Sequence, residues 1–300
     1  MLSSTTVLPF CWITAHNPWS RPSRNAWNTG MLRRNDPPPK SSDEQTEAQD
    51  QPVRSVIVIG ASAGGRAVIG TVLKDLSHDI PAAIVVMLHV APDSDFDLPK
   101  WFRQFGHIEI RETRQGERLR EGMVFVAPPG HSISVHDGQL DVKTLEHSTS
   151  PRHTINCLFE SAAKTYGDRV IGVILSGYLA DGSQGLRAVH EAGGLTIIQN
   201  PEDAEQWDMP ANALKQVPEA TFSLNGADIG LTLDLMARRN AELESGLSSA
   251  VRLLKERIAL LVRLVEQSKG NEATHGYLST ELKSLRGELQ SVKKLLSESQ

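Results

Sequence analysis

Between residues 53 and 233, short apolar runs alternate with segments of helical periodicity. The runs have no alternating polar positions, which is typical of strands buried on both faces of a parallel sheet. Strands are predicted over residues 56–59, 82–89, 170–175 and 195–199. Helices are predicted over residues 66–76, 155–166 and 186–192. This alternation predicts an α/β fold with a doubly wound, mostly parallel sheet of the Rossmann or flavodoxin-like type.

A smaller antiparallel element interrupts the alternation. Residues 132–136 and 139–143 read as strands on either side of Asp137-Gly138, a dipeptide that strongly favours a tight hairpin turn. Residues 109–113 and 123–127 read as further short strands. We therefore expect one β-hairpin in addition to the parallel sheet.

Beyond residue 234 the spacing changes to that of a coiled coil. Apolar residues step by four and three in two blocks: Leu247, Val251, Leu254, Ile258, Leu261 and Val265, then Leu278, Leu282, Leu285, Leu289, Val292 and Leu296. The blocks are out of frame, which predicts a break near residues 270–276. They either fold back as an antiparallel hairpin or pair with a second chain. Residues 234–300 are thus expected to be a helical tail that binds a partner or forms a homodimer, following a domain over residues 53–233.

The remaining composition excludes several classes of protein. Residues 1–52 are polar and proline-rich and are expected to be a disordered leader. A net charge of -5 argues against nucleic-acid binding, and no apolar run reaches the roughly 20 residues needed for membrane insertion. Cys11 and Cys157 do not form a disulfide framework, which favours the cytoplasm. The histidines lack metal-ligand spacing, so we expect no metal and no cofactor.

Candidate chemistry begins in the turn after the first strand. Gly60, Ser62 and Gly64 have the G-x-S-x-G spacing of a nucleophile elbow, in which glycines permit a sharp strand-to-helix bend. The alternative is a phosphate- or dinucleotide-binding turn, although Ser62 occupies the central glycine position of that motif. The helix start after Ser62 would offer N–H donors to a developing oxyanion, and the candidate residues there are Ala63, Gly64 and Gly65.

Two more polar residues are placed at equivalent strand ends. His89 ends the second strand, and Asp181 lies in the turn after residues 170–175. A neutral imidazole can remove the proton of a serine hydroxyl, and a carboxylate can orient that imidazole. Singly, His89 could cap the sheet and Asp181 could be a turn residue or a helix N-cap. Together with Ser62, they favour a catalytic site at the carboxyl edge of the sheet.

Several motifs in the same order resemble the catalytic domain of the chemotaxis protein-glutamate methylesterase (CheB) family. They lie at residues 60–65, His89, residues 126–131, 175–182, 199–204 and 209–210, and the resemblance covers about residues 53–233. The resemblance implies a hydrolase of glutamate γ-methyl esters on chemoreceptors, with receptor glutamine deamidation in many members. It implies that Ser62, His89 and Asp181 form the triad. Their order along the chain differs from that of α/β-hydrolases.

The chain also departs from the family pattern. Ala63 stands where the family usually has threonine, and Tyr178-Leu179 stands in a loop that usually reads Gly-Met-Gly and contributes to the oxyanion site. Tyr178 is therefore a candidate substrate or oxyanion residue. Residues 152–156 replace an Arg-Pro-Ser-Val-Asp stretch, and we expect the family's receiver domain to be missing, because only the leader precedes residue 53.

The resemblance leaves more than one function open. A methylesterase would act on a methylated chemoreceptor or related sensor, with a histidine kinase, a response regulator or a second copy of the chain as further partners. The alternative is a non-catalytic scaffold of a sensory complex that keeps the fold. A nucleotide-binding regulator is the weaker third hypothesis.

Overall fold

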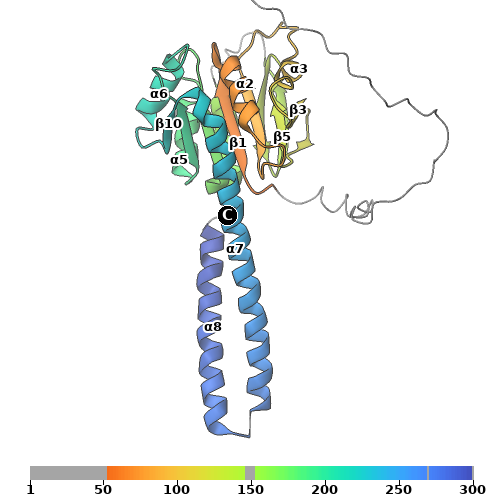
Figure 1. Ribbon diagram of the computed structural model, residues 1–300, viewed down its shortest axis with the longest axis vertical. Coiled ribbons are helices and arrows are strands. Elements are labelled where there is room, and N and C mark those ends of the chain that lie inside the picture. Colours follow the sequence, from red (N-terminus) through yellow and green to blue (C-terminus); the bar gives the residue numbers. More distant parts are fainter. Residues whose placement is uncertain (1–52, 146–152, 269, 299–300) are drawn as a thin grey trace, which may run out of the picture. The chain divides into compact units, whose positions relative to one another are not determined.

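The computed structural model describes residues 53–145, 153–268 and 270–298, so the leader predicted over residues 1–52 lies outside it. Its centre is a seven-stranded parallel sheet in the order β10-β9-β8-β1-β2-β5-β3 (Figure 1). The strands are β1 (Val56–Ala61), β2 (Ala83–Leu88), β3 (Glu109–Glu112), β5 (Met123–Val126), β8 (Val170–Ile174), β9 (Leu195–Gln199) and β10 (Phe222–Leu224). The predicted mostly parallel sheet is confirmed.

Helices cover both faces of the sheet because its strands bury side chains on both sides. Along β1, Val56 and Val58 belong to one apolar core, and Ile57 and Ile59 belong to the other. The first core is closed by α4 (Thr154–Tyr166), α5 (Ser183–Glu191) and α6 (Asp208–Gln216). The second is closed by α2 (Gly65–Asp75), α3 (Leu98–Phe102) and the start of α7 (Gly226–Gln267). This is the predicted doubly wound arrangement.

The predicted hairpin is present as β6 (His131–His136) and β7 (Gln139–Thr144). Asp137 and Gly138 both have positive φ values, 48° and 75°, as a two-residue type I′ turn requires. A short strand that the sequence pattern did not indicate, β4 (Glu117–Arg118), pairs with β7 to complete a three-stranded antiparallel sheet. Ile133, Val135 and Leu140 of this sheet pack in the same core as α4.

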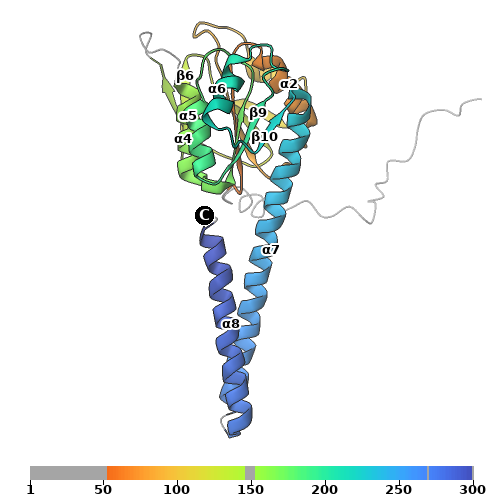
Figure 2. The same ribbon diagram turned by 90° about the vertical axis from the view of Figure 1, so that its left-hand side faces the viewer.

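The C-terminal helices form an antiparallel hairpin. Helix α7 is 42 residues long, and α8 (Glu272–Glu298) lies beside its second half in both ribbon views (Figures 1 and 2). Leu261 packs against Leu282 and Leu285, and Arg257 forms a 2.8 Å ion pair with Glu281. Of the two arrangements left open by the sequence, folding back is therefore the one observed.

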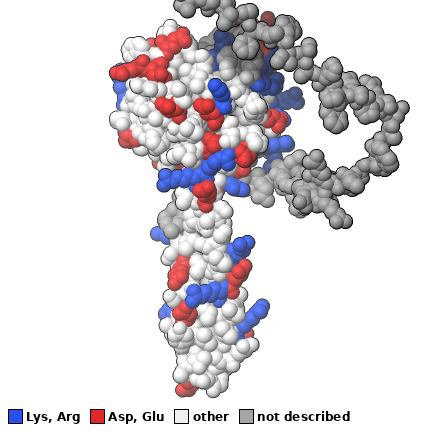
Figure 3. Space-filling model, viewed as in Figure 1, with Lys and Arg blue, Asp and Glu red and all other residues white. Residues whose placement is uncertain are grey.

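Helix α7 also belongs to the α/β domain. Its first turns pack on α2, so the helix passes without a break through the predicted boundary between residues 233 and 234. Acidic and basic side chains are interspersed along the hairpin surface (Figure 3). None of the described helices combines the length and apolar character needed to cross a membrane.

Candidate active site

The three predicted catalytic residues meet at one edge of the sheet. Strands β8, β1 and β2 are neighbours, and Ser62, Asp181 and His89 follow β1, β8 and β2. Strand pairing continues past the strand ends, since Ser62 N–H donates to Ser176 O at 3.0 Å and His89 N–H donates to Ala61 O at 3.0 Å. The chain winds in opposite directions from β1, so this edge is a topological switch point, where ligands of open α/β sheets bind.

These side chains line a pocket of about 710 Å³. Tyr178, predicted as a substrate or oxyanion residue, also lines it, whereas Ala63, Gly64 and Gly65 are not among its lining residues. The pocket further includes residues that the sequence had not indicated, among them His153, Asn156, Asn212 and Lys215.

The turn that carries Ser62 depends on a glycine at position 64. Gly64 is the N-cap of α2 with a φ of 78°, and a Cβ atom there would lie 2.5 Å from Ser176 Oγ. Gly65 N–H donates to Ser62 O at 3.0 Å. In the described part of the chain, the N–H groups of Ala63 and Gly64 have no hydrogen-bond acceptor. They are thus free donors at the positive end of α2, where a developing oxyanion would be stabilised.

His89 is held from one side of its ring. Its Nε2 lies 3.1 Å from Asp181 Oδ2 and 2.9 Å from Thr154 Oγ1. If Nε2 carries the proton that it shares with Asp181, Nδ1 is the nitrogen left to act as a base. Over the described residues no hydrogen bond joins Ser62 Oγ to the ring.

Asp181 is fixed by the start of α4. Its side chain is 5% exposed and accepts hydrogen bonds from Ile155 N–H at 3.1 Å, Asn156 N–H at 3.2 Å and Gly182 N–H at 2.9 Å. The N-terminal dipole of α4 adds to these bonds, because a helix N-terminus favours negative charge. The carboxylate is therefore oriented by backbone groups and has one oxygen directed at His89.

The loop after β8 packs directly against Ser62. A Cβ atom on Gly177 would lie 2.8 Å from Ser62 Cβ and would collide with Met209 Sδ. Tyr178 and Leu179 line the pocket and are 53% and 59% exposed.

Thr154 contacts His89 and is a further candidate site residue, which the sequence analysis did not assign. It is the first residue of α4. The sequence feature that could have pointed to it is its place in residues 152–156, the stretch that departs from the family pattern. Its hydroxyl is positioned beside the imidazole of His89 because the N-terminus of α4 is directed at Asp181.

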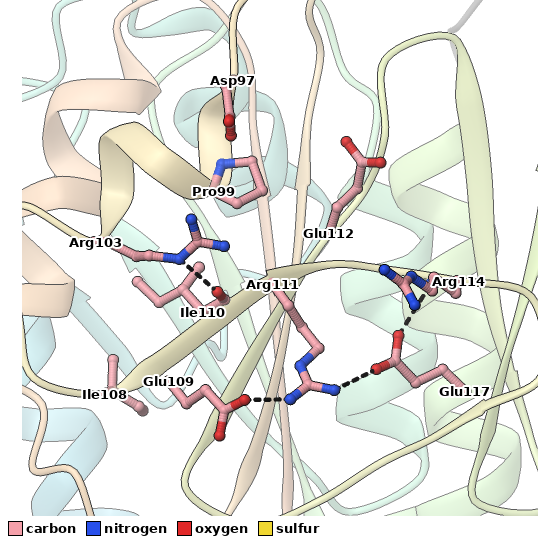
Figure 4. A pocket seen from close by; sticks show the side chains of 10 residues that line it. All are labelled: Asp97, Pro99, Arg103, Ile108, Glu109, Ile110, Arg111, Glu112, Arg114 and Glu117. Atoms are coloured by element: carbon pink, nitrogen blue, oxygen red, sulfur yellow. Dashed lines mark hydrogen bonds and ion pairs between the residues drawn. The ribbon is translucent and has the colours of Figure 1, made fainter.

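A second pocket, of about 640 Å³, lies beside the edge strand β3 (Figure 4). Its charged groups largely pair with each other: Arg111 bridges Glu109 and Glu117, and Arg103 Nε donates to Ile110 O at 3.0 Å. None of the predicted catalytic residues lines it. Within the described ranges, no group of three or more His, Cys, Asp or Glu side chains is placed to hold a metal ion.

Comparisons with known proteins identify the family of the chain. The CheB methylesterase family matches residues 57–233. A putative protein-glutamate methylesterase/protein-glutamine glutaminase from Leptospira interrogans serogroup Icterohaemorrhagiae serovar copenhageni is 38% identical over 163 residues, which are 53% of this chain and 83% of that protein. Protein-glutamate methylesterase/protein-glutamine glutaminase 2 from Anaeromyxobacter dehalogenans is 35% identical over 188 residues, 63% of this chain, which spans only 53% of that relative.

A solved structure supports the same assignment. The crystal structure of the Thermotoga maritima CheB methylesterase catalytic domain is similar with a TM-score of 0.55 and 25% sequence identity, over 61% of this chain and 98% of that one. The match over residues 57–233 includes Ser62, His89 and Asp181. The chain belongs to the CheB methylesterase family.

Proposed function

We propose that the protein is a protein-glutamate methylesterase that hydrolyses glutamate γ-methyl esters on a chemoreceptor or related sensor protein. One observation carries the proposal: Ser62, His89 and Asp181 line a single pocket at the switch point of the sheet, with His89 hydrogen-bonded to Asp181. The names of the matched relatives support both the methylesterase activity and a second activity, deamidation of protein glutamines.

The proposed reaction is an acyl transfer through Ser62. His89 Nδ1 takes the hydroxyl proton while Oγ attacks the ester carbonyl carbon, and the oxyanion faces the N–H groups of Ala63 and Gly64. Collapse of the tetrahedral intermediate breaks the bond to the methoxy oxygen, and the imidazolium returns the proton to methanol. Water, activated by His89, then hydrolyses the acyl-enzyme to glutamate and free serine. Asp181 holds the ring in one tautomer and stabilises the imidazolium.

Glutamine deamidation follows the same course with ammonia as the leaving group. The amide carbonyl replaces the ester carbonyl, and His89 donates its proton to the departing nitrogen. The exposed side chains of Tyr178 and Leu179 flank this pocket and suit a substrate presented on a protein surface.

Methanol release from a methylated receptor tests the proposal. We expect the wild-type protein to release methanol and Ser62→Ala to be slower by on the order of 10⁴-fold or more, because loss of a triad nucleophile costs several orders of magnitude. Ser291→Ala, an exposed serine on α8, is the matched control and should behave as wild type. Equal release by wild type and Ser62→Ala would refute the catalytic role of Ser62. Binding without any release would favour the scaffold hypothesis.

We further propose that the α7–α8 hairpin joins two copies of the chain. Leu253 and Leu260 on α7 are 60% and 57% exposed, although the helix packs on α8 through Leu254 and Leu261. Exposed leucines on a hairpin that has buried its other face favour a further helical partner. Light scattering should find a dimer that Leu253→Glu with Leu260→Glu converts to a monomer. A wild-type chain that stays monomeric would contradict this and leave a histidine kinase or response regulator as the alternative partner to test.

We also propose a cytoplasmic location. The free thiol of Cys157 is compatible with a reducing compartment, in which thiols persist. Fractionation of cells that express the full chain tests this, and recovery only from an oxidising compartment would contradict it.

A further inference from the structure

A chain of polar groups, buried at Ser176 and Gln199 and exposed at Asp203, lies next to the turn of residues 62–65, here called the nucleophile turn. Ser176 and Gln199 are 0% and 1% exposed. Ser176 N–H donates to Gln199 Oε1 at 2.9 Å, and Gln199 Nε2 donates to Asp203 Oδ2 at 2.8 Å. Gln199 therefore accepts a hydrogen bond through its carbonyl oxygen and donates one through its NH₂ group, as a side-chain amide can.

One end of this chain fixes two peptide planes of the nucleophile turn. Ser176 O accepts the Ser62 N–H at 3.0 Å, and Ser176 Oγ donates to Ala63 O at 2.8 Å. In a trans peptide the C=O and the following N–H point in opposite directions, so the bond to Ala63 O also sets the direction of the Gly64 N–H. That N–H is one of the two free donors of the turn.

The other end reaches the tail helix. Asp203 Oδ2, which accepts from Gln199, also accepts the N–H of Gly226 at 2.7 Å. Gly226 is the first residue of α7. A continuous series of hydrogen bonds thus joins the N-terminus of α7 to the backbone of Ser62, through the buried side chain of Gln199 and the solvent-exposed side chain of Asp203.

We propose that Gln199 and Asp203 are positioning residues for the nucleophile turn: they hold Ser176 so that Ser62 and the Gly64 N–H keep their reactive orientation, and they tie that orientation to the start of α7. The inference rests on the proposed esterase function. Neither side chain lines the pocket, so their effect on the reaction is exerted through Ser176. Loss of the link leaves the buried Ser176 N–H without an acceptor and lets the turn relax.

The first test is Gln199→Met, which keeps the length of the side chain and removes both polar atoms. We expect kcat to fall by on the order of 10- to 100-fold with KM little changed, because a displaced nucleophile loses rate while the pocket that binds substrate remains. Labelling of Ser62 by a fluorophosphonate should slow by a similar factor. A residue with a purely structural role would not give this separation of kcat from KM.

The second test reverses the polarity of the link. Gln199→Glu places a carboxylate against Asp203, and the two like charges should repel and reduce kcat. Adding Asp203→Asn removes the like charge. At the single position where Oδ2 accepts both bonds, however, the amide can either donate to the new carboxylate or accept from the Gly226 N–H, so we expect a partial recovery, with kcat above that of Gln199→Glu and below that of wild type. A double variant that folds and is no more active than Gln199→Glu would overturn the proposal.

Asn200→Ala is the matched control. Asn200 is in the same loop and bonds to Asn225 at the start of α7 at 3.3 Å, but it makes no bond to Ser176. It should retain wild-type kcat, and circular dichroism and thermal unfolding should show all variants folded.

Hydrogen exchange at the Ser62 amide separates this inference from the esterase proposal. The amide should exchange faster in Gln199→Met than in wild type and Asn200→Ala, whether or not the protein releases methanol. Unchanged exchange, or wild-type kcat and labelling in Gln199→Met, would overturn the positioning role. If the wild type releases no methanol and the Gln199→Met variant still exchanges faster at Ser62, only the esterase function is refuted.

Discussion

Replacing Asp181 by asparagine perturbs the site at its most constrained carboxylate. Its two oxygens accept from Ile155, Asn156 and Gly182 N–H groups, and Oδ2 also faces His89 Nε2. In Asp181→Asn one oxygen becomes an NH₂ donor. If this group takes the Oδ2 position, Ile155 N–H loses its acceptor and the imidazole faces a donor. If it takes the Oδ1 position, two backbone N–H groups lose their acceptor.

The size of the effect follows from these contacts. One or two buried N–H groups without acceptors, at about 1–3 kcal/mol each, should lower the free energy of unfolding by about 2–4 kcal/mol. An amide donor next to Nε2 favours the tautomer with the proton on Nδ1, which cannot accept the Ser62 proton. The rate of methanol release should therefore fall by about 10⁴-fold, as expected when a triad imidazole is held in the wrong tautomer.

Asp234→Asn is the matched control for the loss of stability. Asp234 accepts from Ser77 N–H and Oγ–H and from Arg238 Nε, joining α7 to the end of α2 away from the pocket. Burial raises the pKa of Asp234, but the hydrogen bonds from Ser77 and Arg238 outweigh it, so the pKa lies below its ordinary value. This variant should lose stability in urea unfolding and keep wild-type kcat. An Asp181→Asn protein within 10-fold of wild type, or equal losses of activity in both variants, would refute the assigned role of Asp181.

Three further outcomes are expected. Thr154→Val removes the hydroxyl 2.9 Å from His89 Nε2 and should lower kcat for methanol release about 5- to 10-fold, the equivalent of one hydrogen bond of about 1 kcal/mol. An unchanged kcat would show that the hydroxyl has no role. Gly177→Ala places a methyl group 2.8 Å from Ser62 Cβ and should slow fluorophosphonate labelling at least 10-fold. Unchanged labelling would contradict this and show that the loop after β8 moves to accommodate the methyl group. The difference in free energy of unfolding between wild type and Asp234→Asn should have its full size above about pH 3.8 and shrink as the pH falls further. The pKa of Asp234 is lowered in the folded state, so its carboxylate stabilises that state only while it is charged. Urea unfolding at a series of pH values measures it, and a difference that grows toward acid pH would contradict the sign.

The sheet and its strand-end residues could be predicted because their signals are local. Strands β1, β2 and β8 are continuous apolar runs, and Ser62, His89 and Asp181 come directly after them or in the following turn. The sequence pattern does not predict helices α3 and α6, which are short and contain proline near their starts.

The interactions that organise the site are of long range and have no local signature. Thr154 contacts a histidine 65 positions earlier, and Ser176 Oγ reaches a carbonyl 113 positions away at Ala63. Such contacts depend on which loops the topology brings together. The break between α7 and α8 was visible as a change of frame, whereas the start of α7 at Gly226 depends on packing against α2.

Site-specific labelling of Ser62 is the most direct measurement of the central claim. Wild-type protein treated with a fluorophosphonate should carry the adduct on the peptide that contains Ser62, and His89→Gln should suppress it by several orders of magnitude, because the hydroxyl then has no base. No adduct on Ser62 in the folded wild type, or equal labelling of wild type and His89→Gln, would contradict the account.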